Sequence, residues 1–280
     1  MFLAELLRAD SAPIFATLCL DALSARVAEQ AGFACGYVSG GALGYAHAVS
    51  EALLSVDELA DVVRHVTARS DLHLLVDGGV GFGDAVHVTR TVQVLEAAGA
   101  AAIELEDQVA PKRVSHHRGI EHLIATTDMV AKIQCAVDAR RSAETLIIAR
   151  TGAVHNESAA AACVRAQAYA EAGADMILIM PETEEDWSLV QQQLDLPLVC
   201  FGALAGRSAA AWRELGVSLV IDPFTVQVMQ VQALQKLYAD FFAGRALQPS
   251  TKELFQTYGQ LDEIAGFDAL YAVEDRTTER

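Results

Sequence analysis

The chain has 280 residues, of which 52% are hydrophobic and 20% charged, a composition typical of one globular domain with a large core. Its net charge is −17 and it has no run rich in lysine and arginine, which argues against nucleic-acid binding and means that an anionic ligand needs positive charge supplied locally. The N-terminus lacks the pattern of a signal peptide, and no apolar run approaches the roughly 20 residues of a membrane span, so we expect a cytoplasmic protein.

Eight short, continuous apolar runs predict parallel strands that are buried on both faces. In chain order they are Ile14–Thr17, Ala34–Val38, Leu72–Val76, Ala101–Leu105, Leu146–Ala149, Met176–Ile179, Leu198–Cys200 and Leu219–Ile221. Runs with apolar residues three and four positions apart predict a helix after each strand. These are Ser24–Gln30, Val56–Thr67, Val86–Ala98, Met129–Ala139, Ala159–Ala172, Glu184–Gln193, Ala209–Leu215 and Phe224–Phe242.

Several predicted helices end in a glycine that directly precedes the next strand, as in Glu-Ala-Ala-Gly-Ala at residues 96–100. Such a glycine is the expected C-cap of a helix. Eight strands alternating with eight helices predict a closed (β/α)₈ barrel of the TIM type. The structural alternative is a doubly wound open sheet, but its G-x-G-x-x-G fingerprint is missing because Gly81-Phe82-Gly83 has no third glycine.

The C-terminal part differs in character from the barrel pattern. We expect the barrel domain at residues 1–244 and a helical extension at residues 245–280. Within the extension, Lys252–Ala272 is amphipathic and is expected to pack on the barrel or on a neighbouring subunit. Glu274–Arg280 is polar and is expected to be frayed.

The five cysteines show no paired spacing such as C-x-x-C, and three of them lie in apolar runs that resemble strands. We therefore expect buried, reduced thiols and no disulfide framework. They are Cys19, Cys35, Cys135, Cys163 and Cys200.

Polar residues follow the predicted strands, where a barrel of this type builds its active site. Asp77 and Glu106 lie at the ends of neighbouring strands, and two carboxylates converging there suit a hard cation such as Mg²⁺, with Mn²⁺ as a substitute. The alternative is that Asp77 caps a turn and that Glu106 pairs with an arginine.

Arg150 ends the apolar run Leu146–Ala149, and a buried arginine needs an anionic partner. Its forked guanidinium fits a substrate carboxylate, whereas pairing with Glu106 or Glu182 is the structural alternative. The Ser39–Gly41 turn can present backbone N–H groups to an anion.

Two adjacent histidines, His116 and His117, lie in the long loop after the fourth strand. Acid–base or metal-ligating roles suit them, and so does a role in stabilising the loop, and both interpretations stay open. A G-x-S-x-G elbow and a nucleotide-binding P-loop motif are both absent from the sequence, which argues against serine-hydrolase and nucleotide-hydrolysing chemistry.

Taken together, the motifs resemble the isocitrate lyase / phosphoenolpyruvate mutase superfamily, and most closely its 2-methylisocitrate lyase-like members. The similarity runs in order from about residue 10 to residue 225. The segments that carry it are Asp21–Arg26, Tyr37–Gly41, Gly81–Gly83, Glu106–Gln108, Pro111–Arg113 and Ala149–Thr151.

The resemblance implies a barrel whose last helix is swapped onto a partner, dimers that assemble into tetramers, Mg²⁺ and α-oxycarboxylate substrates. It also implies that Asp77 holds the Mg²⁺ ion and that Glu106 belongs to the water shell of that ion. The residues expected to contact the substrate are Tyr37, Ser39, Gly40, Gly41, Arg150 and Glu182. The residues expected to be catalytic are Arg150 and three members of the mobile gating loop, Lys112, Ser115 and His116.

The chain departs from the family pattern at several of these positions. Val114 stands where the lyases carry a cysteine general acid and the mutases an asparagine, so a proton would have to come from Ser115, His116, His117 or water. Glycines replace acidic residues at positions 79 and 152, and Phe201 replaces an asparagine. Ser50 replaces a further acidic residue, for which the neighbouring Glu51 could substitute. Fewer carboxylates weaken Mg²⁺ binding, because the affinity for a hard cation rises with ligand charge.

The leading hypothesis is therefore a Mg²⁺-dependent carbon–carbon lyase or decarboxylase. It would act on a small 2-hydroxy or 2-oxo di- or tricarboxylate through an enolate-like intermediate. One alternative is carbon–phosphorus chemistry on a phosphonopyruvate-like substrate, as a mutase or hydrolase. Another is a degenerate barrel that binds a carboxylate without turnover. Apart from its small carboxylate and further copies of itself, the protein is expected to have no nucleic-acid or membrane partner.

Overall fold

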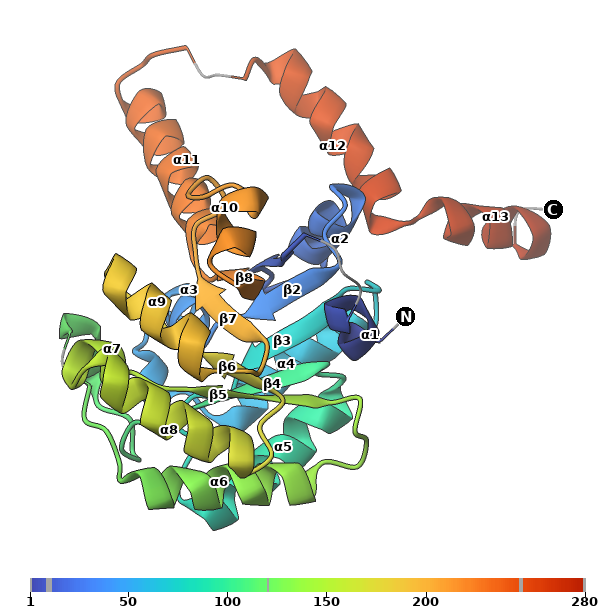
Figure 1. The fold of residues 1–280 in the computed structure, drawn as a ribbon. Coiled ribbons are helices and arrows are strands. Elements are labelled where there is room, and N and C mark those ends of the chain that lie inside the picture. Colours follow the sequence, from blue (N-terminus) through green and yellow to red (C-terminus); the bar gives the residue numbers. More distant parts are fainter. Residues whose placement is uncertain (1, 9–11, 120, 247–248, 279–280) are drawn as a thin grey trace.

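Eight parallel strands close into a barrel, with most of the helices arranged around it (Figure 1). The computed structural model describes residues 2–8, 12–119, 121–246 and 249–278. Each strand pairs with the next in the chain, and β8 pairs with β1 to complete the ring, so the predicted (β/α)₈ fold is confirmed. The strands are β1 (Ile14–Leu18), β2 (Cys35–Val38), β3 (His73–Asp77), β4 (Ala102–Glu106), β5 (Leu146–Arg150), β6 (Met176–Leu178), β7 (Leu198–Phe201) and β8 (Val217–Asp222).

The strands form where the sequence has uninterrupted apolar runs, because each strand is covered on both faces. One buried cluster fills the barrel interior with side chains from many strands, including Tyr37, Leu75 and Ile148, and Leu3 of the first helix joins it. A second cluster lies between the strands and the outer helices and includes Val76, Leu95 and Ile133. All five cysteines are free thiols. Four of them are buried, as expected, whereas Cys135 is only half-buried.

The predicted helices lie within three residues of their expected bounds, and caps explain where several begin and end. Ser55 and Glu58 form a reciprocal capping box at the start of α4. Gly99 ends α5 with a φ of 106°, as the expected glycine C-cap requires. These helices are α2 (Ala22–Gln30), α4 (Val56–Thr67), α5 (Ala85–Ala98), α6 (Thr126–Ala139), α8 (Ala159–Glu171), α9 (Glu184–Gln193), α10 (Ala209–Glu214) and α11 (Thr225–Phe242).

Short helical pieces that the sequence pattern does not predict occur in the N-terminal segment and in the loops after the strands. They are too short to show an amphipathic period, and α3 begins with two glycines, which disfavour a helix. It forms because the Ser39 hydroxyl accepts a hydrogen bond from the Ala42 N–H and caps its first turn. These pieces are α1 (Leu3–Arg8), α3 (Gly40–Ala46), η1 (Glu51–Leu53), η2 (Val114–Arg118) and α7 (Ala153–Asn156).

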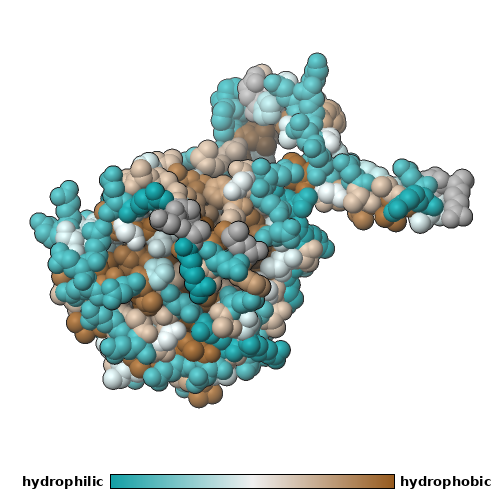
Figure 2. All heavy atoms as spheres, turned by 45° about the vertical axis from the view of Figure 1, so that its right-hand side comes forward, coloured by the Kyte–Doolittle hydropathy of each residue, from teal (hydrophilic) through white to brown (hydrophobic). Residues whose placement is uncertain are grey.

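The C-terminal helices α11, α12 (Thr251–Ala265) and α13 (Asp268–Thr277) form an arm that extends away from the barrel (Figures 1 and 2). The expected single amphipathic piece is divided, because Gly266 takes a left-handed conformation that ends α12. The expectation that Glu274–Arg280 is frayed is wrong for residues 274–277, since α13 continues to Thr277, and residues 279–280 lie outside the described part of the chain. None of the described helices is long and apolar enough to cross a membrane.

Candidate active site

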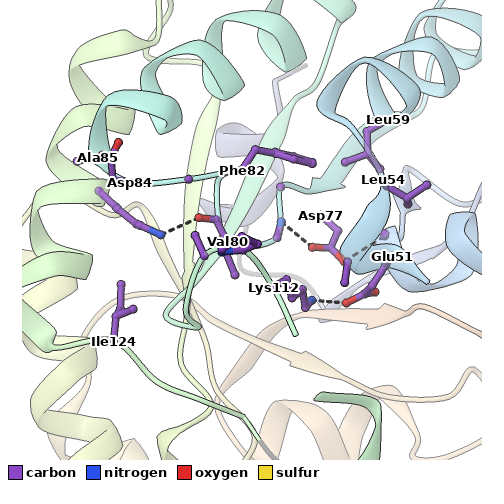
Figure 3. Close-up of a pocket in the computed structure, with 18 of the residues that line it drawn as sticks. Glu51, Leu54, Leu59, Asp77, Val80, Phe82, Asp84, Ala85, Lys112 and Ile124 are labelled. Atoms are coloured by element: carbon purple, nitrogen blue, oxygen red, sulfur yellow. Dashed lines mark hydrogen bonds and ion pairs between the residues drawn. The ribbon is translucent and has the colours of Figure 1, made fainter. Parts of the chain in front are cut away.

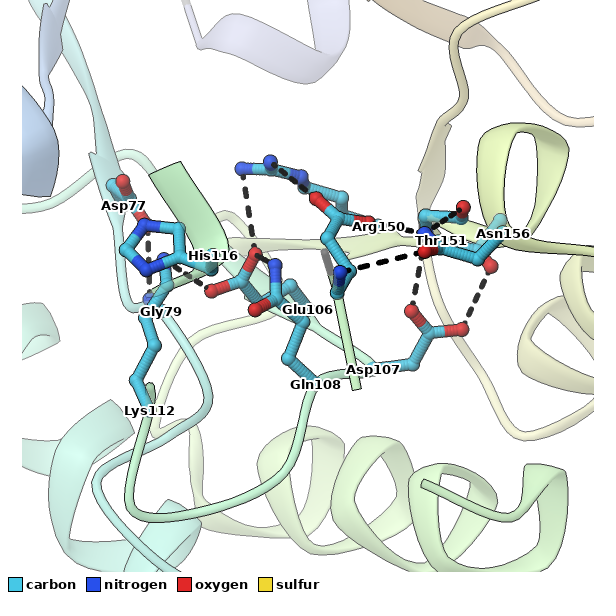
Figure 4. A network of polar contacts seen from close by, with 12 residues as sticks. Asp77, Gly79, Glu106, Asp107, Gln108, Lys112, His116, Arg150, Thr151 and Asn156 are labelled. Carbon is cyan, nitrogen blue, oxygen red and sulfur yellow. Dashed lines mark hydrogen bonds and ion pairs between the residues drawn. The ribbon is translucent and has the colours of Figure 1, made fainter. Parts of the chain in front are cut away.

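The polar residues predicted at the strand ends come together at one end of the barrel. Asp77, Glu106 and Arg150 are the last residues of β3, β4 and β5, and Glu106 is the register partner of Arg150. Because parallel strands end at the same rim, the barrel places these three side chains side by side (Figure 4).

Asp77 is buried, and its two carboxylate oxygens each accept a backbone hydrogen bond. Oδ1 accepts from the Gly79 N–H at 2.9 Å, and Oδ2 accepts from the Gly40 N–H at 3.0 Å. Asp77 therefore does cap the turn, as the alternative interpretation of the sequence predicted. Each of its oxygens keeps a lone pair that can accept from another partner. Burial raises the pKa of Asp77, and the nearby Lys112 ammonium opposes that rise.

Glu106 lies between two cations (Figure 4). Its Oε1 is 2.5 Å from Lys112 Nζ, and its Oε2 is 3.6 Å from Arg150 Nη1 and accepts a hydrogen bond from Gln108. Burial alone would raise the pKa of Glu106, but Lys112 and Arg150 outweigh it and hold the pKa below its ordinary value. Among the described residues no donor makes a well-oriented hydrogen bond to Oε1. This carboxylate is therefore charged, and Lys112 is the counter-ion at Oε1.

The loop after β4 folds over the rim and is held there by ion pairs. Lys112 contacts Glu51 as well as Glu106, and His116 Nε2 is 2.6 Å from Glu51 Oε1. Burial lowers the pKa of Lys112, but Glu106, Asp77 and Glu51 outweigh this effect and raise it. The Glu51 carboxylate thus points into the site, as the sequence analysis had suggested it could in place of the acidic residue lost at position 50. The Ser50 hydroxyl instead caps η1.

The turn after β2 contains two glycines, and the carboxylates of Glu51 and Asp77 lie against them. A Cβ atom at Gly41 would lie 2.9 Å from Glu51 Oε2, and one at Gly40 would lie 3.1 Å from Asp77 Oδ2. Only glycine therefore admits both acids so close to the backbone.

Arg150 makes contacts that the sequence only partly predicts. Its Nη1 donates to Glu104 Oε1 at 3.0 Å, and the same nitrogen lies 3.6 Å from Glu106. Its guanidinium carbon is 5.0 Å from the centre of the Phe201 ring, an arrangement that favours a cation–π contact. The structural alternative of pairing with Glu106 is confirmed, whereas Glu182 pairs with His155 at 3.0 Å instead.

Glu104 is a member of the site that the sequence analysis missed. It points into the barrel from the middle of β4, where it accepts hydrogen bonds from the Tyr37 hydroxyl at 2.8 Å and from Arg150. Burial, reinforced by Asp77, raises the pKa of Glu104 to about 7. A signal was present in the sequence, because a carboxylate inside an apolar strand is costly unless it has polar partners.

A second missed acid, Glu121, fills space that a glycine leaves free. A side chain at Gly152 would collide with the Glu121 carboxylate, which Asn156 holds by a hydrogen bond of 3.0 Å. Glu121 Oε1 lies 3.9 Å from Arg150 Nη2. A carboxylate from another loop thus stands beside Gly152. At Gly79, by contrast, nothing lies within 4 Å of a built Cβ atom.

Asp107 joins the loops after β4 and β5 from below the site. Its carboxylate accepts hydrogen bonds from the Thr151 hydroxyl, the Tyr169 hydroxyl and the Gly152 N–H. Arg165 lies 3.5 Å away and adds positive charge. These contacts fix the chain directly after Arg150, and Asp107 itself is fully buried.

The other predicted residues lie at varying distances from this centre. Tyr37 is buried beneath it, and Ser39 caps α3 beside Asp77. Ser115 and Val114 are exposed on η2, and Glu182 is exposed at the mouth of the barrel. The His117 side chain lies outside the described part of the structure.

The donor set fits a magnesium ion that keeps several waters. Within the described residues, no three histidine, cysteine or acidic side chains are arranged to ligate one metal directly. Asp77 and Glu106 nevertheless offer hard carboxylate oxygens. Glu106 Oε1 pairs with the Lys112 ammonium but receives no well-oriented hydrogen bond from the described residues. Mg²⁺ commonly binds through one or two carboxylates with water completing its shell.

Two cavities border the charged centre. One of about 620 Å³ opens next to Glu51, Asp77 and Lys112 (Figure 3). The other, of about 300 Å³, lies on the Arg150 side, between His116, Glu121 and Glu182 among others. The site therefore has charged groups at its centre and space on either side.

Comparison with known proteins agrees with this architecture. The family model described as phosphoenolpyruvate phosphomutase matches residues 3–242. A 2-methylisocitrate lyase of Aeropyrum pernix is 41% identical over 207 residues, which cover 72% of this chain and 66% of that protein. A 2-methylisocitrate lyase of Salmonella typhimurium is 33% identical over 90% of both chains. Both are carbon–carbon lyases by name, so the expectation of a lyase is confirmed at the level of the class.

A solved structure extends the likeness to the fold. Phosphonopyruvate hydrolase in complex with oxalate and Mg²⁺ superposes with a TM-score of 0.82 at 31% identity, covering 95% of this chain and 94% of that one. Sequence and structure thus agree over nearly the whole barrel, and the protein belongs to the phosphoenolpyruvate mutase / isocitrate lyase superfamily.

Proposed function

We propose that the protein cleaves a carbon–carbon bond in a small 2-hydroxy or 2-oxo di- or tricarboxylate and leaves an enolate. The observation that carries this proposal is the convergence of Asp77, Glu106 and Arg150 at one barrel rim, two acids facing one forked cation. A 2-oxo or 2-hydroxy acid has an anionic head, and its cleavage places a second negative charge on the neighbouring oxygen. A site for it needs cationic groups fixed in place beforehand.

Arg150 is the group that would bind the substrate carboxylate. Glu104 holds Nη1, Asp107 fixes the backbone around the residue, and Phe201 supports the guanidinium plane. Such support keeps the fork in one orientation, so that little side-chain entropy is lost when a carboxylate binds. Tyr37 would stay beneath the substrate, because its hydroxyl already donates to Glu104.

Asp77 and Glu106 would hold Mg²⁺, in keeping with the cation named for the structural relative. When bound, the ion would supply Lewis-acid stabilisation of the charge that develops on the substrate oxygen. The protein's own share is to orient Asp77 through the Gly40 and Gly79 N–H groups and to hold Glu106 deprotonated through the nearby cations.

The final proton would reach the enolate from His116 or from water. Val114 has no proton to transfer, and the side chains of Val114 and Ser115 are both exposed. His116, by contrast, contacts Glu51 at the edge of the site. A reaction that needs no dedicated acid, such as decarboxylation or cleavage with protonation by solvent, suits this arrangement. Loss of a general acid lowers a rate by about 10²–10⁴, so a slow enzyme is expected.

Two measurements test the proposal. Mg²⁺ together with oxalate should raise the melting temperature more than either alone, because both bind the folded site only. A panel of malate, citrate, 2-methylisocitrate and oxaloacetate analogues should then include at least one acid from which a 2-oxo acid is released. Phosphate release from phosphonopyruvate would favour carbon–phosphorus cleavage instead. Binding of oxalate without turnover of any acid would contradict the lyase.

We also propose that the protein is a homo-oligomer in which the arm covers a neighbouring subunit. Along α11 only Asp240 is buried, and the helix exposes large apolar side chains. They are Val228, Met229, Val231, Leu234, Leu237, Tyr238, Phe241 and Phe242. Apolar surface on this scale is rarely left exposed on a monomer and marks an interaction site.

Light scattering tests this second proposal. The full chain should have the mass of a dimer or tetramer. Leu234→Glu combined with Phe241→Glu should shift it toward the monomer, because a charge buried in an apolar interface is costly. Val164→Glu, an exposed position on α8, is the matched control and should leave the mass unchanged. A wild-type monomer at micromolar concentration would contradict the proposal.

A further inference from the structure

The cavity beside Asp77 is larger than a small dicarboxylate requires. Its volume is about 620 Å³, and its lining includes Asp77 at the barrel rim and Ala131 and Lys132 of α6. Pockets of roughly 300–1,000 Å³ commonly hold ligands of drug size. Space therefore remains next to the acid-binding centre after a small carboxylate has been accommodated.

Much of the lining of this cavity is apolar. Leu54 and Leu59 face it from one side, Val80 and Phe82 from the loop after β3, and Ile124 from the opposite wall (Figure 3). Charged residues also line the cavity. Glu51, Asp77 and Lys112 belong to the charged centre, and Asp84, Asp128 and Lys132 lie elsewhere on the lining. Removing apolar surface from water is favourable, so walls of this kind bind a hydrocarbon group.

The wall formed by the loop after β3 is fixed by hydrogen bonds. The Gly78 N–H donates to the Glu104 carbonyl at 2.8 Å, and the Gly79 carbonyl accepts from the Glu106 N–H at 2.9 Å. Lys132, buried on α6, donates to the Val80 carbonyl at 2.8 Å. Because the loop after β3 is tied to β4 and α6, this wall of the cavity is held in place by the fold.

Gly79 lines the cavity two residues after Asp77 and leaves open space there. Its φ is 53°, and a Cβ atom built on it would meet nothing within 4 Å. No side chain at this position therefore separates a substrate held beside Asp77 from the apolar walls.

We propose that this cavity is a specificity subsite for an alkyl chain carried by the substrate. The substrate would then be a 2-hydroxy or 2-oxo acid with a hydrocarbon branch next to its charged head. The inference rests on the proposed function for the position of that head. The branch would lie against Leu54, Leu59 and Phe82, and would displace water from surfaces that water solvates poorly.

Binding of N-alkyl oxamates, which carry the oxalate-like head and a chain of chosen length, tests the subsite. Calorimetry on the full chain with Mg²⁺ should give an affinity that rises about fourfold per added methylene from N-methyl to N-pentyl. Ala131→Phe should remove this dependence by filling the cavity, while N-methyl oxamate still binds. If Ala131→Phe does not fold, Ala131→Leu should shorten the chain length at which the gain stops.

Gln134→Phe is the matched control, since it adds the same side chain to the exposed face of the same helix and should keep the dependence. Equal affinity across the series would overturn the subsite but leave the proposed function standing if short acids are cleaved. Failure of every oxamate and of oxalate to bind would contradict the acid-binding centre itself, and the subsite with it.

Discussion

Arg150→Lys lowers kcat/KM by at least about 100-fold, whichever acid the protein cleaves. Lysine keeps the positive charge beside Glu104 and Glu106 but loses the planar fork that binds a carboxylate through two parallel hydrogen bonds. Removing one preorganised donor from an oxyanion site costs about 10²–10³ in rate, and here both binding and charge stabilisation suffer.

Lysine is a sharper replacement than alanine at this position. Arg150→Ala would leave Glu104 and Glu106 without one of their cations, and breaking a buried ion pair costs about 3–5 kcal/mol. A loss of activity could then reflect unfolding. Steady-state kinetics and the melting temperature of Arg150→Lys should be measured together.

The matched control is Arg140→Lys, which alters an arginine paired with Asp175 near the opposite end of β5. We expect its kcat/KM to stay close to that of the wild type. Unchanged turnover in a folded Arg150→Lys variant would show that the fork does not hold the substrate.

Asp77→Asn abolishes the stabilisation by Mg²⁺ and oxalate and lowers turnover by about 10²–10³-fold. An asparagine has the same shape but no charge, and its amide nitrogen cannot accept from the Gly40 or Gly79 N–H as the carboxylate oxygens do. The affinity of a hard cation depends on ligand charge, so loss of one of two carboxylates weakens it strongly.

Thermal shift against Mg²⁺ concentration measures this effect directly. Asp84→Asn provides the control, since Asp84 lies in the same loop, caps α5 and is exposed. It should melt at a temperature close to that of the wild type and keep the full response to Mg²⁺ with oxalate. An Asp77→Asn protein that responds like the wild type would place the cation elsewhere.

The barrel could be predicted from the sequence because its signals are local. Each strand is an uninterrupted apolar run and each long helix has an amphipathic period, and neither depends on distant contacts. The pieces that were missed, such as α3 and α7, are only a turn or two long. The sequence shows Gly266, but it does not show that the helix ends there, because one glycine inside an amphipathic run does not by itself end a helix.

The site was predictable only where strand ends supply it. Asp77, Glu106 and Arg150 follow from the rule that parallel strands present their last residues at one rim. Glu121 could not be found this way, because it reaches Gly152 from a loop about 30 positions earlier in the chain. Glu121 and Gly152 come together only when the chain folds, so no local sequence pattern indicates their contact.

The ion pairs of the loop after β4 bear on how the protein folds. Asp77, Glu106 and Glu51 are like charges in a poorly solvated place, and such a group is unstable without compensation. Lys112 contacts two of them and lies close enough to the third to influence its pKa, and His116 faces Glu51. The chain thus carries its own counter-charges for its acidic rim. We therefore expect the barrel to fold without a bound metal. A chelator should then remove its activity without unfolding it, in contrast to domains whose folding depends on a metal.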